Sequence, residues 1–145
     1  MQPYPHLYQA RVVGDESGMN HSTSQNLPML TVAGPAEFDG PGDQWSPETL
    51  ICATAANCLV LTFRAVARAS SFTWLQLVCD VQGTLDRSDG VARFTHFALR
   101  ARLILPRGTD MERAKRLMDK AEKACIIVNS LNGTHSLDVE IVERE

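Results

Sequence analysis

The sequence lacks the features typical of membrane, secreted and nucleic-acid-binding proteins. No apolar run approaches the roughly 18 residues that cross a bilayer, and the N-terminal residues show no basic segment followed by an apolar core. The formal net charge is only −3, so there is no basic footprint for nucleic acid. We therefore expect a cytoplasmic protein that binds neither membranes nor nucleic acid.

Closely spaced metal ligands are also missing. The four cysteines are at positions 52, 58, 79 and 125, and no two of them have the C-x₂-C spacing of structural zinc sites. There is no G-x-S-x-G motif, so a Ser-His-Asp hydrolase has no support. In a reducing compartment, such cysteines are more often free, catalytic or metal-bound than part of a disulfide framework. We expect no bound metal and no organic cofactor.

The residues that are present suit one globular domain. Hydrophobic residues make up 44% and charged residues 21% of the 145 positions, which is an ordinary composition for a folded domain. A chain of this length can bury roughly two thirds of its unfolded surface. We expect residues 1–145 to form a single domain without internal repeats.

The first third of the chain predicts short strands and loops. Leu7–Val13 is typical of a strand, and a second, weaker strand is expected near Met29–Val32. The segment Gly34–Trp45 contains three glycines and two prolines, so we expect it to be an irregular loop with a functional role.

A long apolar helix is predicted from Ser46 to about Ala69. Ser46 suits the N-cap, and Pro47 suits the first helical position. Apolar or small residues then recur at spacings of three and four: Leu50, Thr54, Cys58, Leu61 and Ala65. Because most of the circumference is small or apolar, we expect this helix to be buried on several sides, at the centre of an assembly.

The remainder predicts a hairpin, a helix and an edge strand. Apolar residues alternate from Leu75 to Leu85 and, after a turn at Ser88-Asp89-Gly90, from Val91 to Leu105. Thr109 and Glu112 have the spacing of a capping box. The helix behind them has a buried stripe of Met111, Ala114, Met118, Ala121 and Cys125. Leu137, Val139 and Ile141 alternate as an edge strand.

Two of the cysteines are candidates for thiol chemistry. Cys58 and Cys125 lie 67 positions apart (125 − 58), and each closes an apolar helical stripe. A free cysteine most often packs as a small hydrophobic residue, which is our interpretation of Cys52 and Cys79. Two thiols in matching settings raise the hypothesis of a redox pair.

A longer pattern around these cysteines resembles a known family. Ser46-Pro47-Glu48-Thr49-Leu50 is followed by Ala55-Ala56-x-Cys58 and, after the hairpin, by Ala121-x-x-x-Cys125 and Asn129-Ser130-Leu131. This pattern and the order of elements are similar to the OsmC/Ohr family of osmotically inducible and organic-hydroperoxide-resistance proteins. The resemblance implies an α+β fold, an intertwined homodimer with antiparallel sheets around two long central helices. It also implies a peroxidatic thiol at Cys58, a resolving thiol at Cys125 and a site carboxylate at Glu48.

Helix geometry constrains the role of Glu48. Ten residues separate it from Cys58 (58 − 48), which corresponds to about 15 Å along one helix. If both serve one site, Glu48 must come from the partner subunit. The alternative is a carboxylate that complements the positive end of the helix dipole.

Two positions depart from the family pattern. Peroxidase members carry an arginine after the first strand or just before a Phe-acid-Gly segment, where this chain has Asp15-Glu16 and Glu37. Ile126 replaces the proline that usually follows the second cysteine. A nearby cation lowers a thiol pKa. We therefore expect Cys58 to ionise at a higher pH and to turn over slowly, unless Arg11 supplies the cation.

The sequence thus predicts a homodimeric thiol peroxidase that reduces organic hydroperoxides. The Cys58 thiolate attacks the O–O bond and becomes a sulfenic acid, which Cys125 converts to a disulfide. A dithiol then reduces the pair, and the resemblance suggests a lipoyl group for this role. The alternative is a non-catalytic member that senses redox state or holds a hydrophobic ligand.

Overall fold

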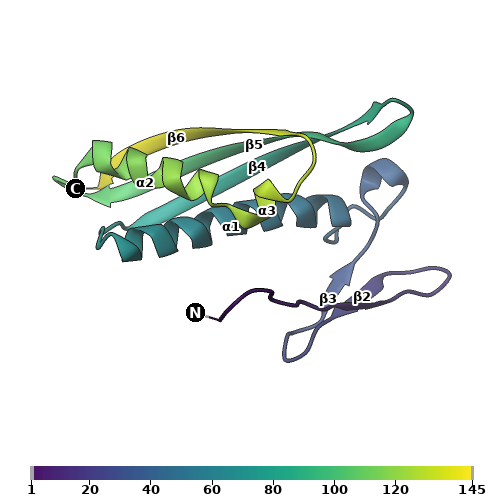
Figure 1. Ribbon diagram of the computed structural model, residues 1–145. Coiled ribbons are helices and arrows are strands. Elements are labelled where there is room, and N and C mark those ends of the chain that lie inside the picture. Colours follow the sequence, from purple (N-terminus) through teal and green to yellow (C-terminus); the bar gives the residue numbers. More distant parts are fainter. Residues whose placement is uncertain (1, 145) are drawn as a thin grey trace. The chain divides into compact units, whose positions relative to one another are not determined.

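The computed structural model describes residues 2–144 and divides the chain into two compact units, one ending at Leu50 and the other beginning at Ile51 (Figure 1). The first unit contains a small antiparallel sheet in the order β1-β2-β3. Its elements are β1 (Arg11–Val13), β2 (Asn20–Thr23), β3 (Leu30–Val32) and a short 3₁₀ helix, Ala36–Phe38.

The structure refines the strands predicted in the first unit. The strand expected over Leu7–Val13 is confined to Arg11–Val13, whereas the one near Met29–Val32 is confirmed as β3. Strand β2 was not predicted, because its residues are all polar and show no apolar alternation. The Gly34–Trp45 segment is irregular apart from the 3₁₀ turn and one bridge between Val32 and Trp45.

Helix α1 spans Pro47–Ala69 and begins where the sequence predicts. The Thr49 N–H donates to Ser46 Oγ over 3.1 Å, and the Ser46 N–H donates to Thr49 Oγ1 over 2.9 Å. Each residue therefore satisfies the other's backbone N–H, and the N-cap role of Ser46 is confirmed.

The second unit contains a three-stranded sheet in the order β4-β5-β6. Its strands are β4 (Gln76–Ser88), β5 (Val91–Pro106) and β6 (Thr134–Arg144). The β4–β5 hairpin is confirmed, and the positive φ angles of Asp89 (52°) and Gly90 (78°) suit the tight turn that joins its strands.

The expectation of purely antiparallel sheets is wrong for β6. This strand pairs with β5 in parallel, from His96 opposite Thr134 to Pro106 opposite Arg144. The intervening helices carry the chain back along the sheet, and such a crossover makes the next strand parallel. Strand β6 does lie at the edge of the sheet, as predicted.

Helices α2 (Met111–Lys123) and α3 (Ile126–Asn129) form that crossover. The predicted capping box at Thr109 and Glu112 is wrong. The N-cap is Asp110, whose carboxylate accepts a hydrogen bond from the Arg113 N–H over 3.1 Å. The Thr109 hydroxyl instead donates to the Pro106 carbonyl over 2.6 Å, so it closes the preceding turn.

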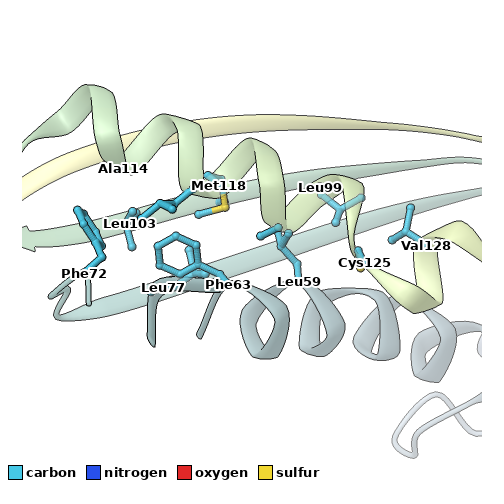
Figure 2. Close-up of a cluster of buried hydrophobic side chains, with 14 of the residues drawn as sticks. Leu59, Phe63, Phe72, Leu77, Leu99, Leu103, Ala114, Met118, Cys125 and Val128 are labelled. Atoms are coloured by element: carbon cyan, nitrogen blue, oxygen red, sulfur yellow. The ribbon is translucent and has the colours of Figure 1, made fainter. Parts of the chain in front are cut away.

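Side chains from α1, α2 and α3 pack with one face of the sheet in a single hydrophobic cluster (Figure 2). The apolar residues of β5 are buried as predicted, including Phe97, Leu99 and Leu103. Phe63 of α1 lies at the centre and meets Trp74 edge to face, with ring centroids 5.3 Å apart. Of the predicted stripe on α2, Ala114, Met118 and Ala121 are buried as expected. Met111 is exposed instead, and Leu117, which was not predicted, is buried.

The buried side of α1 is not the predicted one. The residues that α1 buries are Ala55, Leu59, Phe63 and Ala67. In the predicted stripe, Leu61 is 54% exposed and Thr54 and Ala65 are exposed, while Cys58 lies at the boundary. Both sides of the helix are apolar, so periodicity alone could not select the one that faces the sheet. Helix α1 is also long and apolar enough to cross a membrane, a property it shares with core helices of soluble proteins.

Candidate functional site: two thiols between α1 and α3

The structure brings Cys58 and Cys125 together. Cys58 lies in the middle of α1 and is partly buried, whereas Cys125 is 1% exposed and lies between α2 and α3. Figure 2 places Cys125 at the corner where the chain leaves α2, above α1 and beside Val128. Both cysteines are free thiols, and each thiol is among the causes that shift the pKa of the other.

The break between α2 and α3 sets the position of Cys125. Helix α2 ends at Lys123, and Cys125 adopts an extended backbone conformation (φ −68°, ψ 101°) as the N-cap of α3. Its carbonyl accepts the Asn129 N–H over 3.0 Å, which closes the first turn of α3. The predicted burial of Cys125 is confirmed, but the residue lies just beyond the helix whose stripe it was expected to end.

Two further groups contact the Cys58 sulfur. The backbone N–H of Ile127 donates to Cys58 Sγ over 3.4 Å. The Thr62 hydroxyl, one turn further along α1, lies 3.9 Å from the same sulfur. Thr62 follows Cys58 by four residues, so helical spacing alone places its hydroxyl near the sulfur. The contact between the Ile127 N–H and Cys58 Sγ could not be predicted from the sequence, because it involves a backbone group far away along the chain.

These contacts decide the ionisation of Cys58. Burial raises the pKa of the Cys58 thiol, but hydrogen bonds from the Ile127 N–H, the Cys125 thiol, the Thr62 hydroxyl and the Ile126 N–H outweigh it, and the net pKa is lowered. The expectation that Cys58 would ionise at higher pH is therefore wrong. Hydrogen-bond donors lower the pKa of Cys58, an effect that was expected to need an arginine side chain.

Cys125 shifts in the opposite direction. Burial is the largest cause that raises the pKa of its thiol to about 11, and the hydrogen bond to Cys58 and the repulsion between the two sulfurs act in the same direction. At neutral pH Cys125 is therefore protonated and able to donate to a Cys58 thiolate. In this pair, Cys58 therefore ionises more readily than an ordinary thiol, and Cys125 ionises less readily.

Glu48 lies in the first turn of α1, ten residues before Cys58. Its Oε1 atom is buried and has no hydrogen-bond partner within residues 2–144. Burying an unsatisfied carboxylate oxygen is costly, so Glu48 differs from an exposed carboxylate that merely complements a helix dipole.

The other two cysteines occupy packing positions. A Cβ atom built on Gly83 of β4 would lie 2.9 Å from Cys52 Sγ, so the glycine allows α1 to approach the sheet closely there. Burial, followed by the nearby Asp80 carboxylate, raises the pKa of Cys79 to about 11. Across the described part of the chain, no group of three or more His, Cys, Asp or Glu side chains could hold a metal ion.

Known proteins share both the sequence pattern and the fold. The family profile described as OsmC-like protein matches residues 40–141. The uncharacterized protein YmaD of Bacillus subtilis is 27% identical over 139 residues, which cover 93% of this chain and 92% of YmaD.

Two solved structures extend the similarity to three dimensions. An OsmC-like protein of unknown function from Vibrio cholerae superposes with a TM-score of 0.85 at 15% identity, covering 94% of this chain and 100% of its own. An organic hydroperoxide resistance protein OsmC from Legionella pneumophila superposes with a TM-score of 0.74 at 23% identity, covering 97% and 99% of the two chains. At these identities, the likeness establishes the α+β fold.

Proposed function

Because the chain belongs to the OsmC-like protein family, we propose that it is a thiol peroxidase that reduces organic hydroperoxides through Cys58 and Cys125. The main support is the contact between two free thiols whose pKa values shift in opposite directions. The thiolate is the reactive form of cysteine, so the thiol with the lowered pKa suits the attacking role.

The first step transfers one oxygen atom. The Cys58 thiolate attacks the terminal oxygen of the hydroperoxide, an S–O bond forms and the O–O bond breaks. The alkoxide that leaves takes a proton from water and departs as an alcohol. Cys58 is oxidised to a sulfenic acid, and the hydroperoxide is reduced.

The second step uses the neighbouring thiol. The Cys125 sulfur attacks the Cys58 sulfenic acid, the S–O bond breaks, and water leaves as the Cys58–Cys125 disulfide forms. A dithiol, for which we propose a lipoyl group, then reduces this disulfide by exchange and is itself oxidised to a disulfide. The cycle needs no bound metal or organic cofactor.

We further propose that the working unit is a cytoplasmic homodimer with the α1 helices at its centre. The outward side of α1 carries Leu61 at 54% exposure, and the first unit leaves Val12, Val13 and Trp45 about half exposed. Exposed apolar surface of this kind is typical of an interface. A partner subunit would also supply the donor that Glu48 Oε1 lacks. Sedimentation that shows a folded monomer at micromolar concentration would overturn the dimer and, with it, a Glu48 contributed across the interface.

Two serine variants test the thiol mechanism. We expect Cys58→Ser to abolish consumption of cumene hydroperoxide. Cys125→Ser should permit a single turnover and leave a sulfenic acid on Cys58, because the attacking thiol remains and only its resolving partner is lost. The measurements are single-turnover peroxide consumption by the reduced protein and mass spectrometry of the trapped sulfenic acid.

The matched control is Cys52→Ser, which should consume peroxide at the wild-type rate. Equal, full activity in Cys58→Ser and Cys125→Ser would rule out the mechanism. A reduced wild-type protein that consumes no peroxide would instead favour a redox sensor or a hydrophobic-ligand-binding protein.

A further inference from the structure

The Cys58 sulfur is surrounded by donors that carry no formal charge. The Ile127 N–H points at Sγ from 3.4 Å, and the Thr62 hydroxyl lies 3.9 Å from it. A thiolate can only accept hydrogen bonds, so the Thr62 hydroxyl must donate once Cys58 is ionised. The two donors reach the sulfur from different elements, α3 and α1.

The Ile127 N–H is available because of its place in α3. The first N–H groups of a helix have no acceptor within that helix. In α3 the first turn is closed by the Asn129 N–H on the Cys125 carbonyl, so the Ile127 N–H is not needed for it. Cys125 is the N-cap that sets the direction of this turn. The residue that supplies the second thiol therefore also aims a donor at the first.

We propose that the Ile127 backbone N–H and the Thr62 hydroxyl are positioning groups that stabilise the Cys58 thiolate, so that neutral donors replace a cation at this site. The inference depends on the proposed function only for the use of the thiolate against peroxide. The other titratable groups in the hydrophobic cluster around Cys58 are the Cys52, Cys79 and Cys125 thiols. Cys79 and Cys125 remain protonated near neutral pH because their pKa values are raised to about 11.

The first test removes the Ile127 donor with Ile127→Pro. Proline has no N–H, and this position in the first helical turn donates no bond to α3 itself. We expect the midpoint of Cys58 alkylation to move to higher pH. A hydrogen bond to a charged group contributes about 1.5–3 kcal/mol, so alkylation below the midpoint should slow by about tenfold or more. Peptide mass mapping of iodoacetamide adducts across pH gives the rate for Cys58 alone.

Ile126→Pro is the matched control. It places proline at the first position of α3, which proline favours, after a Cys125 backbone that is already extended. Because the Ile126 N–H is the last of the hydrogen-bond donors in order of effect on the Cys58 pKa, we expect a smaller change. An equal shift in both variants would indicate distortion of the turn and would count against the proposal.

Thr62→Val provides a second route that leaves the backbone of α3 untouched. Valine keeps the shape of threonine but has no hydroxyl, so the alkylation midpoint should again rise, and Thr62→Ser should restore it. In the wild-type protein, the amide proton of Ile127 should shift in NMR spectra with the same midpoint as Cys58 alkylation. This NMR titration tests the hydrogen bond from the Ile127 N–H to the Cys58 thiolate even if Ile127→Pro does not fold.

The proposal is overturned if the Ile127 amide does not respond to ionisation of Cys58, or if Thr62→Val and a folded Ile127→Pro both keep the wild-type profile. Alkylation requires no peroxide, so the two proposals can fail separately. If the protein consumes no hydroperoxide but its variants show shifted alkylation midpoints, the stabilisation of the Cys58 thiolate by these donors is supported. The proposed peroxidase function is then overturned.

Discussion

Gly83→Ala should loosen the packing of α1 on the sheet close to the thiol pair. A Cβ atom at this position would lie 2.9 Å from Cys52 Sγ and 2.9 Å from Phe94 Cε1, whereas ordinary contacts begin near 3.4 Å. Each neighbour would have to retreat by about half an ångström. Overpacking of this kind costs about 1–3 kcal/mol, against which replacing a flexible glycine gains about 0.4–1 kcal/mol. We expect a net loss of about 1–2 kcal/mol in the free energy of unfolding.

Urea denaturation of single and double variants measures this effect. Cys52→Ala removes the sulfur that the new methyl group would meet, so the double variant should lose less stability than the sum of the two single variants. Gly34→Ala is the control, because a Cβ there meets nothing within 4 Å and the residue has no positive φ. An unchanged unfolding free energy for Gly83→Ala, or strict additivity with Cys52→Ala, would refute the close approach.

Two further predictions concern α2 and the sheet. Asp110→Ala should cost about 1 kcal/mol of stability through loss of the N-cap. Glu112→Ala should cost little, because Glu112 only pairs with Lys115 on the surface at 3.8 Å. A larger loss for Glu112→Ala than for Asp110→Ala in urea denaturation would contradict the N-cap role of Asp110. Burial raises the pKa of Cys79 from 9.0 to about 11, so the unfolded chain loses this proton first as pH rises. Stability should fall from about pH 9 towards pH 11, and less steeply in Cys79→Ala; identical slopes in urea titrations would contradict the raised pKa.

Local patterns in the sequence predicted most of the elements but not how they combine. Ser46-Pro47 placed the start of α1, and Asp89-Gly90 placed the hairpin, because caps and tight turns depend on a few adjacent residues. The buried side of α1 was not predictable, because the choice depends on which apolar surface meets the sheet. The parallel direction of β6 was missed for a similar reason, since it depends on the path of the crossover.

The candidate site, like the fold, was predicted only in part. The two thiols were found from their positions in apolar stripes and from the family resemblance, and the structure brings them together. The direction of the Cys58 pKa shift was predicted wrongly, because the prediction depended on a charged side chain near the thiol. The deciding donors are a main-chain N–H and a hydroxyl, and a backbone donor leaves no signature in residue type.

The raised pKa of Cys125 has a consequence for the order of events in the proposed cycle. After burial, the causes that raise it include the hydrogen bond and the repulsion between its sulfur and that of Cys58. Both weaken when Cys58 gives up its charge to become a neutral sulfenic acid. Cys125 therefore stays protonated until Cys58 has reacted with peroxide. Its thiol becomes easier to ionise only after that step. The two thiols therefore react in a fixed order, because oxidation of Cys58 weakens two of the causes that raise the pKa of Cys125.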